Sequence, residues 1–183
     1  MKDIVKPIAV LAAICLVVTA LLAYINSVTS PIIAKANAKA EAEAVQEVLP
    51  GAASFETVYE KGGENSIVAA LPEEVTTVYK ADDGSGYVFK LTAKGYGGDI
   101  TLMCAIKSYG TIESTKTLSH SETSGIGSKV VDNGSDYRKQ YEGKTADKLD
   151  EVDAVTGATI SSKAYKKAIT AAFDAFATIK EAK

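Results

Sequence analysis

Two side-chain types that carry much of the metal and disulfide chemistry of proteins are scarce in this sequence of 183 residues. It has one histidine, His120, and two cysteines, Cys15 and Cys104. Cys15 lies in an apolar N-terminal run and Cys104 in an expected strand, so we do not expect a disulfide between them. Structural metal sites draw several Cys or His ligands from closely spaced positions. We therefore assign no metal ligand to this chain.

Positive charge is also limited. The chain has a net charge of -3 and a pI near 5.3, and Arg138 is its one arginine. Proteins that bind nucleic acid neutralise phosphates with a basic face, which this composition does not supply. We therefore expect no nucleic-acid partner.

One long uncharged run is present near the N-terminus. The eighteen residues from Ile8 to Ile25 carry no charge, and this length meets the minimum for a helix that spans a bilayer. Lys2 and Lys6 precede the run, so the positive-inside tendency places the N-terminus in the cytoplasm. We expect a single-pass anchor in a bacterial plasma membrane, with the rest of the chain on the extracytoplasmic side.

Three other interpretations of this run are weaker. A cleaved signal peptide has a shorter apolar region, and the small residues at Ala34 and Ala36 lie far beyond the run. A lipoprotein signal would use Cys15, yet Ile14 occupies a position that normally holds a small residue. A buried core helix would find few partners in a domain of this size.

A second helix is expected after the anchor. Ser30 suits an N-cap and Pro31 the first helical position, and residues 32–49 are rich in Ala, Glu and Lys before Pro50 and Gly51. We interpret 30–50 as a stalk helix. The predicted organisation is 1–29 as cytoplasmic start and transmembrane anchor, 30–50 as stalk, and 51–183 as an extracytoplasmic domain.

The domain itself is predicted to be α+β. Residues 76–81 and 87–94 are rich in β-branched and aromatic side chains and flank a turn at 82–86, and residues 100–108 and 111–118 form a similar pair. A helix is expected from about Ser162, since apolar residues then recur at steps of three and four. Hairpins followed by a helix predict an antiparallel sheet with packed helices. The apolar stripe consists of Tyr165, Ile169, Ala172, Phe173, Phe176 and Ile179.

A glycine-containing turn with several hydroxyls leads into this helix, over residues 153–161. The first N–H groups of a helix and its positive dipole end stabilise an anion such as phosphate, and Gly157 permits close approach of the backbone. A purely structural alternative stays open, in which Ser161 or Ser162 caps the helix and Gly157 makes an ordinary turn.

This segment resembles the acceptor motif of the FMN-binding domain family, Asp/Glu-x-x-Ser/Thr-Gly-Ala-Thr-x-Ser/Thr. The resemblance implies that Thr159 carries FMN covalently through a phosphoester bond, and that a dedicated flavin transferase moves the FMN moiety from FAD to this hydroxyl. The matching positions, taken as cofactor-binding, are Asp153, Thr156, Gly157, Ala158, Thr159 and Ser161.

A second segment, 119–129, resembles the family's Glu-Thr-Pro-Gly-x-Gly loop, with Ser124 in place of the proline. Loss of proline frees φ at that position. Glycines permit tight turns beside a planar ring, a glutamate can hydrogen-bond the polar edge of the flavin, and a lysine can stabilise negative charge on reduced flavin. A third segment, 95–98, resembles another family element. The candidate site residues from these segments are Tyr96, Gly97, Gly98, His120, Glu122, Thr123, Gly125, Gly127 and Lys129.

The whole pattern of anchor, outward domain and C-terminal motif is similar to the family of G subunits of Rnf electron-transport complexes. This resemblance implies an electron carrier that works with other membrane subunits of an ion-translocating ferredoxin:NAD oxidoreductase, rather than a stand-alone catalyst. Two alternatives remain open, the FMN-carrying C subunit of a sodium-translocating NADH:quinone oxidoreductase and a non-redox membrane-anchored envelope protein. A Ser/His hydrolase is disfavoured, because the Gly-x-Ser-x-Gly pattern is absent.

Overall fold

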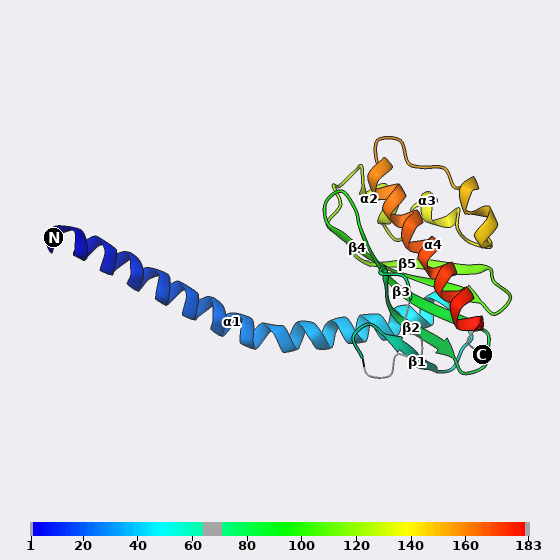
Figure 1. Ribbon diagram of the computed structural model, residues 1–183, viewed down its shortest axis with the longest axis horizontal. Coiled ribbons are helices and arrows are strands. Elements are labelled where there is room, and N and C mark those ends of the chain that lie inside the picture. Colours follow the sequence, from blue (N-terminus) through cyan, green and yellow to red (C-terminus); the bar gives the residue numbers. More distant parts are fainter. Residues whose placement is uncertain (1, 64–70, 182–183) are drawn as a thin grey trace. The chain divides into compact units, whose positions relative to one another are not determined.

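The structure, a computed structural model, describes residues 2–63 and 71–181 (Figure 1). The chain divides into two compact units, Met1–Glu41 and Ala42–Lys183, of which the second is called the head below. The elements, in chain order, are α1 (Lys2–Val48), β1 (Phe55–Glu60), β2 (Val75–Ala81), β3 (Gly86–Lys94), β4 (Asp99–Lys107), β5 (Ile112–Ser119), α2 (Ser128–Val131), α3 (Asp136–Lys139), the 3-10 helix η1 (Ala146–Glu151) and α4 (Thr159–Glu181).

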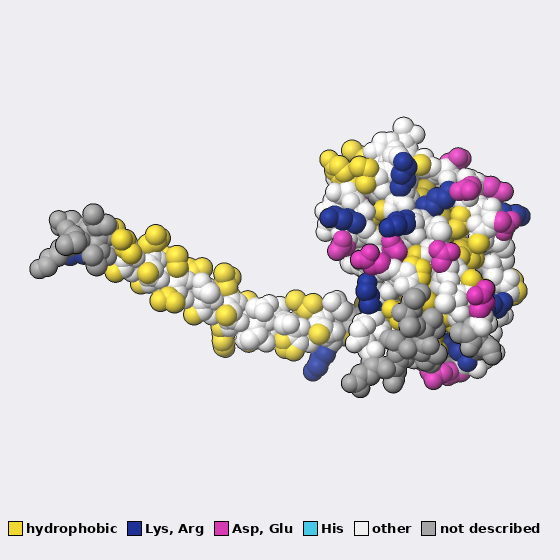
Figure 2. All heavy atoms as spheres, viewed as in Figure 1, with side chains coloured by type: hydrophobic (Ala, Val, Ile, Leu, Met, Phe, Trp, Pro, Cys, Tyr) yellow, Lys and Arg dark blue, Asp and Glu magenta, His cyan; other side chains and the backbone are white. Residues whose placement is uncertain are grey.

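Helix α1 runs without interruption through the predicted boundary at Ser30, so the prediction of a new helix at that residue is wrong. Pro31 lies inside the helix, which costs one backbone hydrogen bond but does not end it, and the Ala-, Glu- and Lys-rich residues that follow favour its continuation. Apolar side chains of residues 8–33 are exposed along it, as Figure 2 shows in yellow. Within the described residues, α1 is the helix that is long and apolar enough to cross a membrane.

The sheet of the head is an antiparallel meander in the order β1-β2-β3-β4-β5. Both predicted hairpins are confirmed, β2 with β3 and β4 with β5. Gly84 lies in the first turn at φ +74, a conformation that suits glycine. Edge strand β1 was not predicted, because its side chains are half-buried or exposed and a register irregularity between Thr57 and Tyr59 interrupts its alternation.

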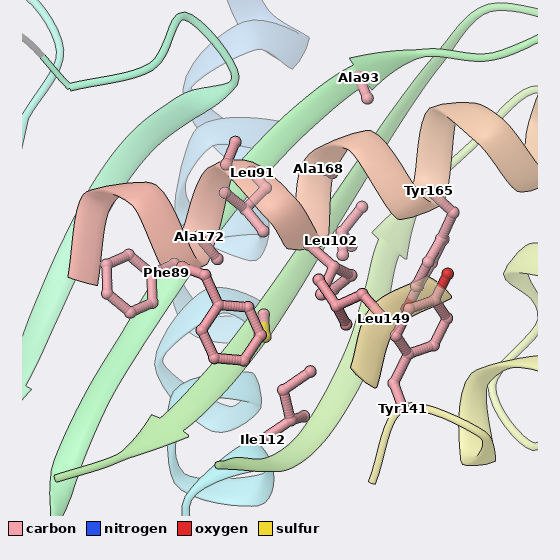
Figure 3. Packing of buried hydrophobic residues seen from close by; sticks show 14 of the residues in the cluster. Phe89, Leu91, Ala93, Leu102, Ile112, Tyr141, Leu149, Tyr165, Ala168 and Ala172 are labelled. Atoms are coloured by element: carbon pink, nitrogen blue, oxygen red, sulfur yellow. The ribbon is translucent and has the colours of Figure 1, made fainter. Parts of the chain in front are cut away.

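One face of the sheet packs against α4. Side chains alternate between faces along a strand, so Phe89 and Leu91 of β3 point with Leu102 of β4 into the same core (Figure 3). The predicted apolar stripe of α4 meets them: all of its members are buried except Ile179, which is partly buried. The stripe prediction is confirmed, and the core it forms holds the start of α4 against the sheet.

The opposite face of the sheet is covered by the end of α1. Val88 and Met103, which alternate with residues of the first core, pack with Val45 and Val48 of α1 in a second cluster. The Ser114 hydroxyl donates to the carbonyl of Val48 at 3.0 Å, and Lys116 forms an ion pair with Glu47 of α1. The last turns of the predicted stalk are therefore part of the head, which begins at Ala42.

Candidate functional site

The loop before α4 is held in place by the first turn of the helix. Gly157 has φ +83, and the N–H of Ala158 donates to the carbonyl of Val155 at 2.9 Å. The Ser162 hydroxyl in turn accepts from the N–H of Val155 at 3.1 Å. These contacts start α4 at Thr159, three residues before the predicted start at about Ser162.

Thr159 is exposed and stands at the wall of a pocket of about 440 Å³. As the first residue of α4, it lies where the backbone N–H groups have no partner within the helix and the dipole end is positive. The structure therefore places Thr159 at the N-terminus of a helix, and anion binding there stays a prediction. The residues that line this pocket, called the Thr159 pocket below, are Tyr96, Glu122, Thr123, Ile126, Gly127, Gly157, Ala158, Thr159, Ile160 and Ser161.

Glu122 connects the two segments that supply most of the lining of the Thr159 pocket, residues 122–127 and residues 157–161. Its side chain is buried, and its Oε2 accepts a hydrogen bond of 2.6 Å from the Ser161 hydroxyl in the first turn of α4. Its Oε1 accepts from the backbone N–H of Gly97 at 3.1 Å. Both carboxyl oxygens therefore have a hydrogen-bond donor as partner. Glu122 thus holds together three segments that are distant in the sequence: the loop at Gly97, its own loop and the first turn of α4.

Glycines make this arrangement of Glu122 sterically possible. A Cβ on Gly95 would collide with Oε1 of Glu122, and a Cβ on Gly97 would collide with the carbonyl of Ser121. A Cβ on Gly127 would collide with Oε2 and would lie 2.9 Å from Cβ of Glu122. Real Cβ atoms essentially never approach so closely, so a side chain at Gly95 or Gly127 would displace the carboxylate and one at Gly97 would displace the backbone of Ser121.

A Gly127→Ala variant is expected to lower the free energy of unfolding by about 1–3 kcal/mol, because the added methyl group displaces Glu122 and breaks its contact with Ser161. The measurement is guanidinium unfolding of the full chain in detergent, followed by circular dichroism. Ser124→Ala, at an exposed position of the same loop, is the control and should stay within about 0.5 kcal/mol of the parent. Equal stability of the two variants would contradict this role of Gly127.

Three of the predicted site residues lie away from the Thr159 pocket. Lys129 and Asp153 line a neighbouring pocket of about 650 Å³, together with Asp132. His120 lies with its Nε2 3.4 Å from a carboxylate oxygen of Asp132, and its Nδ1 accepts from the backbone N–H of Glu122 at 3.3 Å. In this structure His120 supports the loop that carries Glu122.

Four more predicted residues do not line the pocket, and Gly97 among them donates its N–H to Glu122. Gly125 has φ +78, and its N–H donates to the Ser128 hydroxyl at 2.9 Å. Gly98 has φ +153, and its carbonyl accepts from the N–H of Gly95 at 2.8 Å. Thr156 is exposed. Their roles in cofactor binding stay predictions.

The rim of the Thr159 pocket includes two residues that the motifs did not single out, Ile126 and Ile160. They are 52% and 55% exposed, and Tyr96 on the same rim is 71% exposed. Each stands at a variable position of its motif, so the motif itself carried no signal for it. Exposed apolar side chains gathered at one pocket, beside a few polar groups, are typical of a binding site.

A buried tyrosine cluster lies behind the start of α4. The Tyr137 hydroxyl donates to the carbonyl of Ser162 at 2.9 Å and shares a 2.8 Å hydrogen bond with the Tyr141 hydroxyl. Arg138 donates from Nε to the Tyr165 hydroxyl at 3.3 Å. Burial raises the pKa of all three phenols. These side chains therefore stay neutral at physiological pH and anchor the first turns of α4 without adding negative charge.

Comparison with known proteins assigns a class to this site. The family model described as FMN-binding domain matches residues 95–174, a range that contains every residue lining the Thr159 pocket. The head therefore contains an FMN-binding domain, which defines the protein as one that binds a flavin. A second family model, described as RnfG N-terminal region, matches residues 1–48.

Two relatives that align with most of this chain show the family to which it belongs. The G subunit of the ion-translocating oxidoreductase complex of Methanosarcina acetivorans is 32% identical over 94% of both chains. The G subunit of the Na(+)-translocating ferredoxin:NAD(+) oxidoreductase complex of Acetobacterium woodii is 31% identical over 87% of this chain and 85% of its own. The chain belongs to the family of G subunits of ion-translocating oxidoreductase complexes.

The residues of the Thr159 pocket fit FMN. Tyr96, Ile126 and Ile160 offer apolar surface for a planar ring system, and the N-terminus of α4 offers backbone N–H groups for a phosphate. Thr159 adds an exposed hydroxyl at the same place. The pocket therefore has an apolar part and an anion-binding part, as this cofactor requires.

Proposed function

We propose that this protein is the electron-carrying subunit of a membrane-bound, ion-translocating ferredoxin:NAD oxidoreductase complex of the Rnf type, and that its FMN is attached to Thr159 by a phosphoester bond. FMN, when bound, supplies the redox chemistry. The chain's own residues would hold it, orient it and keep it from diffusing away. The chain is then a component of an oxidoreductase and performs no substrate chemistry alone.

One observation carries this proposal. Thr159 presents an exposed hydroxyl on the first residue of α4, at the wall of a pocket that has apolar side chains on its rim. A transferase that adds an FMN moiety needs an accessible hydroxyl, and Ser161, the neighbouring hydroxyl in this turn, is buried and bound to Glu122. Accessibility thus favours Thr159 over Ser161 as the attachment point.

The proposed place of the protein in the cell follows from α1 and from the relatives. Residues 8–25 of α1 would span the membrane, and Lys2 and Lys6 favour a cytoplasmic N-terminus. The head would then lie on the extracytoplasmic side, where a diffusible cofactor would be lost and a covalent tether keeps its local concentration high. The other membrane subunits of the complex and an FAD-dependent flavin transferase are the proposed partners.

The test is co-expression of the full chain with and without a flavin transferase. With the transferase, the purified protein is expected to be yellow, to fluoresce on a denaturing gel and to gain the mass of one FMN moiety. Without the transferase, neither the fluorescence nor the added mass is expected, because the phosphoester bond needs the transferred group.

Two outcomes would contradict the proposal. Colourless protein after co-expression would favour a non-redox envelope protein with the same architecture. Yellow protein that loses its colour on the denaturing gel would show that the flavin is bound but not covalent, and Thr159 would then lose its proposed role.

A further inference from the structure

The charged side chain in the wall of the Thr159 pocket is that of Glu122. Apart from Tyr96, none of the other lining residues has an ionisable side chain. Glu122 is 8% exposed, and within the described part of the chain it forms no ion pair. Its negative charge thus stands in the pocket without a cationic side chain to offset it.

The position of this charge is fixed. Hydrogen bonds from Ser161 and from the N–H of Gly97 hold both carboxylate oxygens. Gly95 and Gly127 pack so closely against the carboxylate that a methyl group on either would collide with it. A buried carboxylate held by several contacts keeps a constant position in the pocket wall. Water and salt screen such a charge less than a charge at the surface.

The cation predicted to face reduced flavin does not line this pocket. Lys129 lines the neighbouring pocket, where Asp132, Asp136 and Asp153 accompany it. Among the groups that line the Thr159 pocket, Glu122 therefore supplies the full charge and the N-terminus of α4 a partial one, and Glu122 already accepts the Ser161 hydroxyl in that helix turn.

We infer that Glu122 sets the reduction potential of the flavin held in the Thr159 pocket and keeps that potential low. Reduction with two electrons and one proton adds one negative charge to the ring system. A fixed carboxylate in the wall raises the free energy of that product relative to the oxidised form. This inference rests on the proposed function, and Glu122 acts in it through its charge, without donating to or attacking the cofactor.

The test compares Glu122→Gln with Ser161→Ala in the full chain, each co-expressed with the flavin transferase. Glu122→Gln removes the charge but keeps the size of the side chain and an acceptor for Gly97. Ser161→Ala keeps the charge and removes one of its hydrogen bonds. The readouts are the flavin content by intact mass and the midpoint potential by dithionite titration with redox mediators, followed by flavin absorbance.

We expect Glu122→Gln to favour reduction by about tenfold or more, which corresponds to a midpoint about 30 mV more positive for two electrons. Ser161→Ala should not shift the midpoint in the positive direction. An unchanged midpoint in Glu122→Gln, equal positive shifts in both variants, or a Glu122→Gln protein without flavin would each overturn the inference. A parent chain without flavin would instead refute the proposed function, so the two failures are distinguishable.

Discussion

A Thr159→Ala variant is expected to carry no covalent flavin, whereas the parent chain should be fully modifiable by a flavin transferase. Alanine has no hydroxyl to form the phosphoester bond. The other hydroxyls in the first turn of α4, those of Ser161 and Ser162, are buried; Ser161 donates to Glu122, and Ser162 accepts from the N–H of Val155. The measurement is the intact mass of both proteins after co-expression with the transferase.

Thr170→Ala is the matched control for this experiment. Thr170 is exposed like Thr159 and lies on the same helix, but it belongs neither to the motif nor to the lining of the pocket. It should keep the full flavin mass. A flavin mass retained by Thr159→Ala, or lost only from Thr170→Ala, would place the attachment elsewhere and contradict the proposed site.

Tyr141→Ala is expected to lower the free energy of unfolding by about 3–5 kcal/mol, as buried aromatic truncations do. Tyr141 is completely buried, in the core that Figure 3 shows. Its ring packs edge-on against that of Tyr137 at a centroid distance of 5.5 Å. Its removal leaves a cavity and takes from the Tyr137 hydroxyl one of its two hydrogen-bond partners. The measurement is chemical unfolding in detergent, followed by the helical circular dichroism signal.

Tyr109→Ala supplies the control for Tyr141→Ala. Tyr109 is 69% exposed, so its truncation should change the free energy of unfolding by no more than about 0.5 kcal/mol. A similar loss in both variants would show that the tyrosine cluster is not a core of the head.

The features that sequence predicted best are those that depend on neighbours along the chain. The β2–β3 and β4–β5 hairpins follow from turn residues between apolar runs, and α4 follows from its apolar period. The motif that ends at Ser161 likewise indicated an anion site at a helix start, and the fold places Thr159 at that start.

Features that depend on contacts distant in the sequence were not predictable in this way. The hydrogen bond between Ser161 and Glu122 joins positions 39 residues apart. Neither residue type by itself predicts the other as its partner. The short helices α2 and α3 have four residues each, too few for a period to show. Lys129 and Asp153 were assigned to the flavin from the sequence, and the structure places them in the lining of another pocket. Their role in cofactor binding stays a prediction.

The insertion of α1 into the second core has a consequence for how such a protein can be released from its anchor. A protease that cut at Pro50 would remove Val45 and Val48, which cover one face of the sheet. The fragment left behind would expose the apolar side chains beneath them and become prone to aggregate. Cleavage at that point would thus destroy the head rather than shed it as a soluble flavoprotein. Because of this packing, proteolytic loss of the anchor would also lead to loss of the folded FMN-binding domain.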